Sequence, residues 1–117
     1  MNREDFLHAM GENCDEALQI VQNKNQDYAD GEDPFQNFRM VEDAGLCSLE
    51  QGIAVRMSDK LQRIFNLLPS DVEAQVEDES LEDSLLDLMN YANILLTYRR
   101  LEQSKEENSG AVAEVTR

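Results

Sequence analysis

Apolar side chains recur every three or four residues through most of this chain, and this spacing most constrains its fold. The first such segment, expected as a helix from Arg3 to about Asn25, carries Phe6, Met10, Cys14, Ala17, Leu18 and Val21. This spacing places the apolar side chains on one face of an α-helix. No segment alternates apolar and polar residues as a half-exposed strand would. The sequence therefore predicts an all-α fold, a small helical bundle.

Local start and stop residues predict the remaining helices. Pro34 suits the first position of a short helix that Gly45 ends. Ser48, followed three residues later by Gln51, forms a capping box at the start of a long helix. Ser80 is the expected cap of the last helix. The prediction is three long helices and one short helix.

The length of 117 residues fits one domain. We expect residues 1–103 to form a single helical domain, because the apolar periodicity stops there. Residues 104–117 are acidic and polar and are expected to form a flexible tail. A homo-oligomer, a dimer or higher, is expected because Leu86, Tyr91 and Ile94 need more cover than one chain of this size readily supplies.

The chain is strongly acidic, with 25 acidic and 10 basic residues and a net charge of -15. This charge repels nucleic acid polymers, so we expect none as a partner. A small phosphorylated ligand is still compatible, because a local cluster of cations can reverse the field at one site. Cys14 and Cys47 fit free thiols in a reducing cytoplasm. No apolar run approaches the ~20 residues of a bilayer span, so no membrane partner is expected.

Three of the ten basic residues follow one another along the predicted third helix. Arg56, Lys60 and Arg63 are separated by four and three residues, which aligns them as a stripe beside the apolar face. One interpretation is that the stripe pairs with carboxylates of a neighbouring helix. The other is a phosphate clamp, because Arg offers a bidentate fork and Lys a point charge.

Two carboxylates lie one turn apart on the predicted last helix. Asp83 and Asp87 share a face with Asn90, and Ile94 continues that line. Mg²⁺ binds through one or two carboxylates together with water and substrate phosphates. The pair is therefore a candidate magnesium site, and a solvated acidic face is the alternative. Ile94 on the same face indicates that the helix is covered on both sides, by a ligand or a second subunit.

Polar and aromatic residues gather around the predicted end of the first helix and the following turn. Lys24, Asp27 and Tyr28 come before the turn, and Asn37 follows it. An aromatic ring here could stack on a base while an amide reads its edge, and aromatic rings in turns also serve as core plugs. These four residues are candidate nucleotide contacts, together with the basic stripe.

Taken in order, these residues resemble the nucleotide-modification-associated domain 1 proteins, a family found largely in phages and bacteria. The resemblance spans most of Lys24 to Leu96, and its pieces are Lys24-x-x-Asp27-Tyr28, Pro34-Phe35-x-Asn37-Phe38, Arg56-x-x-Asp59-Lys60-x-x-Arg63 and Glu82-Asp83-x-x-x-Asp87-x-x-x-Tyr91-Ala92. It implies nucleotide metabolism in a bacterial host cell. More distantly, the acidic helices are similar to those of MazG-like all-α nucleoside triphosphate pyrophosphatases, which hold Mg²⁺ with carboxylates of two helices. This chain lacks their Glu-Glu-x-x-Glu helix before Asp83.

Two classes of function follow. The first is an enzyme that cleaves a nucleotide, with Asp83 and Asp87 on Mg²⁺ and the basic stripe on the phosphates. The second is a protein that binds a nucleotide, such as a second messenger, and sequesters it without chemistry, as a viral anti-defence protein would. A third possibility is a helical interaction protein whose charged stripes only join subunits. The sequence leaves all three open.

Overall fold

A computed structural model of the chain describes residues 1–28, 33–69 and 80–115, with side chains at 1–24, 33–69 and 80–108. These residues form four α-helices and no strand: α1 (Arg3–Tyr28), α2 (Gln36–Asp43), α3 (Leu49–Leu67) and α4 (Leu81–Val115). The prediction of an all-α fold with three long helices and one short helix is confirmed. No described helix combines the length and the apolar content that a bilayer span needs.

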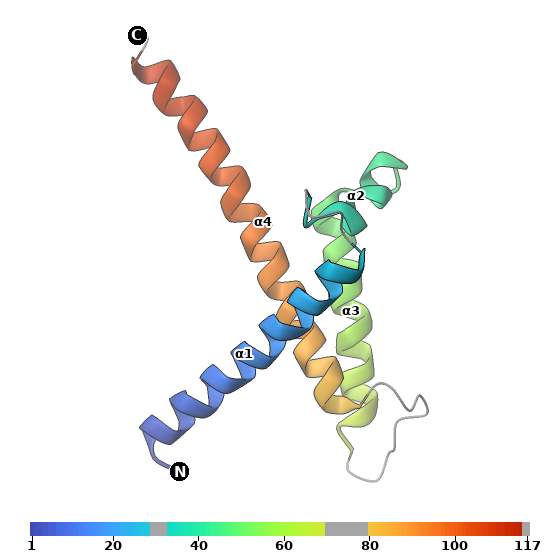
Figure 1. The fold of residues 1–117 in the computed structure, drawn as a ribbon. Coiled ribbons are helices and arrows are strands. Elements are labelled where there is room, and N and C mark those ends of the chain that lie inside the picture. The colour runs from blue at the N-terminus through green and yellow to red at the C-terminus, as the bar shows by residue number, and fades with distance from the viewer. Residues whose placement is uncertain (29–32, 70–79, 116–117) are drawn as a thin grey trace.

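An antiparallel hairpin of α3 and α4 is the centre of the fold, with α2 packed on α3 and α1 crossing α4 (Figure 1). The hairpin register follows from two contacts. The Arg99 guanidinium lies 2.7 Å from the Glu50 carboxylate, and the Lys60 ammonium lies 3.0 Å from the Asp87 carboxylate. The two helices are therefore antiparallel, with the start of α3 beside the middle of α4.

The hydrophobic core lies where the start of α3 meets the middle of α4. Leu49, Ile53 and Phe35 are buried there. The half-buried side chains packed against them are Phe38, Met57, Tyr91, Ile94, Leu95 and Tyr98. This core is small for the length of the helices, and the ends of α1 and α4 extend away from it (Figure 1). Among residues 1–16, all but Ala9 are exposed.

The predicted helix caps of α3 and α4 are confirmed. Ser48 accepts a hydrogen bond from the Gln51 backbone, and the Gln51 side chain accepts one from the Ser48 backbone. Ser80 and Asp83 exchange the same pair of bonds at 3.0 and 3.1 Å. Each reciprocal pair satisfies backbone N–H groups that have no partner inside the helix.

Gly45 ends α2 as predicted, but Pro34 does not begin it. Gly45 has a φ of 75°, in the left-handed region, and the Leu46 N–H bonds back to the Val41 carbonyl, as in a Schellman motif. The helix starts at Gln36 instead, because Pro34 lies in a turn. Two hydrogen bonds to Asp33 close that turn, because the Gln36 N–H donates to the Asp33 carbonyl and the Phe35 N–H donates to the Asp33 carboxylate.

The predicted end of the last helix near Gln103 is wrong, because α4 continues to Val115. We expected an end where apolar periodicity stops, yet this stretch is rich in Glu, Gln and Lys, which are good helix formers without packing. Lys105 also pairs with Glu102 at 3.3 Å, three residues earlier on the helix. Residues 103–108 are exposed, so this part of the extension does not pack against the rest of the described chain.

The residues for which we expected cover from a second subunit are already half-buried. Tyr91 and Ile94 pack against the core cluster, and Leu86 is also of intermediate exposure. The expectation that these side chains need a second subunit for cover is therefore wrong. The oligomer itself stays a prediction.

Candidate functional site

A cavity of about 690 Å³ lies between α1, the segment around α2, and α4. Its volume is within the usual range for small-molecule sites. Along α4 its lining extends from Asp87 to Leu101, a rise of about 21 Å at 1.5 Å per residue. Of the predicted nucleotide contacts, Lys24, Asn37 and Arg56 line it.

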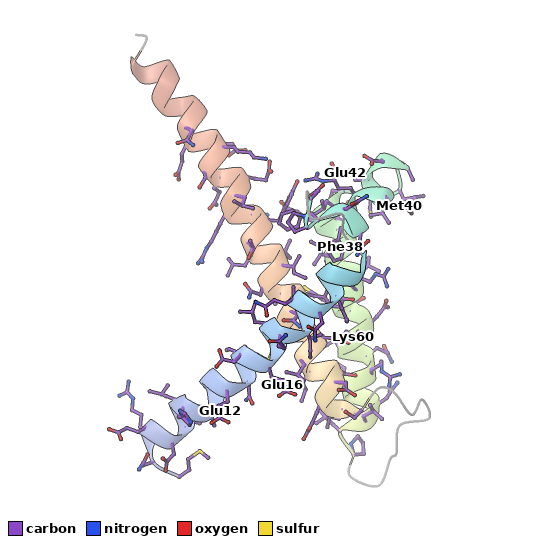
Figure 2. The ribbon with its side chains drawn as sticks, in the orientation of Figure 1. Glu12, Glu16, Phe38, Met40, Glu42 and Lys60 are labelled. Atoms are coloured by element: carbon purple, nitrogen blue, oxygen red, sulfur yellow. The ribbon has the colours of Figure 1, made fainter. Side chains whose placement is uncertain are left out.

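The basic stripe on α3 is divided among three environments. Arg56 is exposed, lines the cavity and makes no ion pair with any described residue. Lys60 reaches toward the crossing of α1 and α4 (Figure 2), where it meets Asp87. Arg63 donates a hydrogen bond of 3.4 Å to the hydroxyl of Ser84, which is fully buried between α3 and α4. Ion pairing with a neighbouring helix is therefore observed for Lys60. The phosphate clamp stays a prediction.

Asp87 connects three helices through its carboxylate. Its Oδ2 lies 3.0 Å from the Lys60 ammonium, and its Oδ1 lies 3.8 Å from the Lys24 ammonium of α1. The Lys60 and Asp87 side chains are 18% and 19% exposed, so this pair is largely shielded from water. Attraction between shielded charges is stronger than at the surface. The pair therefore helps to hold α1 and α3 in place on α4.

Asp83, the other predicted magnesium ligand, caps its own helix. It is exposed, and the hydrogen bonds from the Ser80 backbone and side chain lower the pKa of its carboxyl group. Asp87 faces two ammonium groups, which repel a divalent cation. Within the described residues there is no group of three or more His, Cys, Asp or Glu side chains that could hold a metal. These donors do not fit Mg²⁺, and the magnesium site stays a prediction.

Aromatic rings line the cavity on the side of α2. Phe35 contacts Tyr98 edge to face with ring centres 5.2 Å apart, and Phe38 contacts Tyr91 at 6.2 Å. Of the four rings, Phe35, Phe38 and Tyr91 contribute to the lining. Phe35, Phe38 and Tyr91 thus belong both to the core and to the cavity wall. Base stacking by an aromatic ring, the other predicted role, stays a prediction.

Asp33 fixes the turn that carries Phe35. Its carboxylate accepts a 3.0 Å hydrogen bond from the Phe35 backbone and pairs with the Arg39 side chain on α2. The Arg39 hydrogen bond, followed by the Phe35 backbone bond, lowers the pKa of the Asp33 carboxyl group below its usual 3.8. The charged form is therefore favoured by folding, and its stabilising effect is present above pH 3.8 and lost as the pH falls through the lower, folded pKa.

Asp33→Asn is accordingly expected to lower the melting temperature near neutral pH, because Asn keeps an acceptor for Phe35 but loses the ion pair with Arg39. The difference from wild type should shrink on acidification, with melting curves recorded between about pH 7 and about pH 2.5. Asp43→Asn is the control, because Asp43 is exposed on α2 and pairs with no described residue. A difference that stays constant with pH would contradict the role of the charge.

Amide side chains of α4 complete the cavity wall. Asn90 is only 9% exposed and lines the cavity together with Asn93 and Thr97. Within the described ranges, the Asn90 side chain makes no hydrogen bond. Sequence reasoning noticed Asn90 and Ile94 beside Asp87 but missed Asn93 and Thr97. Asn90, Asn93 and Thr97 follow one another at intervals of three and four residues. This helical spacing could have identified a second, polar face of α4.

Two predicted contacts, Asp27 and Tyr28, lie at the end of α1, and their side chains lie outside the described residues. Comparison with protein-family models, curated proteins and solved structures finds no match to this chain.

Proposed function

We propose that this protein binds a phosphorylated nucleotide in the cavity between α1, α2 and α4. The base would contact the aromatic wall, and the phosphates would meet Arg56 and Lys24. This placement of base and phosphates suits the cavity wall. Aromatic rings stack on bases, and a guanidinium group can donate two parallel hydrogen bonds to a phosphate.

Asn90 is the observation that carries this proposal. The residue is 9% exposed and lines the cavity, where its amide makes no hydrogen bond within the described residues but keeps access to solvent. A ligand that covers this amide must replace its water, because a polar group buried without a partner costs about 1–3 kcal/mol. A ligand with donors and acceptors, such as a nucleotide base, would supply that partner.

The charge of the cavity also supports an anionic ligand. In a chain of net charge -15, its lining contains two cations, Lys24 and Arg56, and one carboxylate, Asp87. Lys60 adds a further positive charge beside Asp87. The local charge is therefore positive, against the sign of the whole molecule, and it would attract phosphates.

Binding without cleavage fits the described side chains better than metal-dependent hydrolysis. Asp83 and Asp87 both have partners in the protein, and neither is placed to share a cation with a third carboxylate. We therefore favour a protein that holds its nucleotide intact, which would make sequestration its effect in the cell.

The test is a binding panel of ribonucleoside monophosphates, triphosphates and cyclic nucleotides, each measured by calorimetry with and without Mg²⁺. The bound nucleotide is then released by heating and chromatographed. Recovery of the unchanged compound supports the proposal. A shortened or altered product would show catalysis, and the absence of binding across the whole panel would refute nucleotide binding.

Arg56→Ala is expected to weaken nucleotide binding by about 10- to 100-fold, because a hydrogen bond to a charged group contributes roughly 1.5–3 kcal/mol. The melting temperature should change little, since Arg56 is exposed and pairs with no described residue. Calorimetry with the best nucleotide of the panel measures the change.

Arg100→Ala is the matched control for this variant. Arg100 is exposed on α4, pairs with no described residue and does not line the cavity. Both variants remove one positive charge, so a general charge effect would weaken binding equally in the two. An equal loss would therefore reject a phosphate contact by Arg56.

A further inference from the structure

The hairpin of α3 and α4 has an apolar face that no described part of the chain covers. We call it the far face. It consists of Leu61, Phe65, Leu68, Leu85, Met89 and Leu96, all exposed. Phe65 is the most exposed of them, at 63%.

The far face lies opposite the cavity. Arg56 of α3 and Asn90 of α4 line the cavity, so they mark the side of the hairpin on which α1 lies. At 100° per residue, Phe65 is half a turn from Arg56. Leu85 is about 140° from Asn90 by the same count. Both helices therefore turn apolar side chains away from α1, and Met89, about one turn before Asn93, lies nearest to the edge of the cavity.

The spacing of these side chains is that of a packing surface rather than of scattered exposed residues. On α3 they follow at intervals of four and three residues, and on α4 Leu85 and Met89 are again four apart. Such stripes pack against another helix in bundles and coiled coils.

The dimensions of the chain indicate how much surface lacks cover. Its accessible surface is 9302 Å², whereas a compact monomer of 13.4 kDa exposes about 6,500 Å². Its radius of gyration is 18.1 Å, against about 13.4 Å for a compact chain of this length. The excess of roughly 2,800 Å² includes the extended ends of α1 and α4, and it is several times the ~800 Å² that each partner contributes to a standard interface.

We propose that the far face is the interface between two copies of this chain, packed across a two-fold axis. A two-fold axis brings the same surface of each copy together, so one apolar face covers the other. Two α3–α4 hairpins would then form a four-helix core, and the two cavities would lie on its outer sides. This assignment does not depend on the identity of the ligand.

The test is the molar mass in solution, measured by light scattering across a dilution series centred on about 10 µM. Wild type should have twice the mass of 13.4 kDa. Phe65→Glu combined with Met89→Glu should raise the dissociation constant by more than about 100-fold, because charges would be buried at the centre of the interface. Circular dichroism checks that the variant keeps its helices.

The control variant adds the same two charges elsewhere. Gln19 and Asn66 are exposed and lie outside the far face, so Gln19→Glu combined with Asn66→Glu should remain dimeric. If the charged far-face variant loses helix, Phe65→Gln replaces it, with an expected weakening of about tenfold or more. A monomeric wild type, or a far-face variant as dimeric as the control, would overturn the proposal. If the control variant, and not the far-face variant, is monomeric, the interface lies elsewhere on the chain and the proposal is wrong.

Discussion

Ile53→Ala is expected to lower the free energy of unfolding by about 2–5 kcal/mol. Ile53 is 0% exposed, at the point where α3, α4 and the start of α2 meet. Truncation removes buried apolar surface and leaves a hole that the neighbouring side chains fill only partly. Folded domains are stable by only about 5–15 kcal/mol, so a large share of the stability is at risk.

Val55→Ala provides the control two residues further along the same helix. Val55 is 56% exposed, so its truncation should cost far less. Urea unfolding followed by circular dichroism measures both variants, at one protein concentration because association would add to stability. Equal losses for the two variants would show that the packing around Ile53 is not the core of the folded protein.

Asp87→Asn is expected to strengthen nucleotide binding by roughly three- to tenfold while lowering stability by about 1–3 kcal/mol. The carboxylate repels phosphates and holds the ammonium groups of Lys60 and Lys24. Removing its charge ends that repulsion and lets Lys24, which lines the cavity, act on a ligand. The same change deprives a largely shielded ion pair of one partner, which weakens the attachment of α1 and α3 to α4.

This variant also separates the two classes of function. If Asp87 instead binds Mg²⁺, Asp87→Asn should weaken nucleotide binding in the presence of Mg²⁺ and abolish any cleavage. Calorimetry with and without Mg²⁺, combined with urea unfolding, distinguishes the outcomes. Asp83→Asn is the control, because Asp83 is exposed at the helix cap and does not line the cavity. It should leave binding unchanged.

The sequence determined those features that depend on residues close together in the chain. The capping boxes at Ser48 and Ser80 and the stop at Gly45 each involve partners within five residues. Their hydrogen bonds form whenever the local backbone is helical, whatever lies around it. The helix count and the all-α class followed from these caps and from apolar spacing.

Apolar spacing was a poor guide to where α4 ends. It reports which part of a helix is packed, whereas α4 continues to Val115 and its residues 103–108 are exposed. Helix propensity alone, from its Glu, Gln and Lys residues, was the better indicator there.

Only the tertiary structure decided what each functional residue does. The sequence aligned Arg56, Lys60 and Arg63 on one stripe, but the register of α4 decided that Lys60 meets Asp87 and Arg63 meets Ser84. The crossing of α1 then added Lys24 to the same carboxylate. Charged side chains interact over a few ångströms in space, whereas residues far apart in the sequence come that close only after the helices have packed. The physical reason is that helical periodicity fixes the direction of a side chain but not its neighbour.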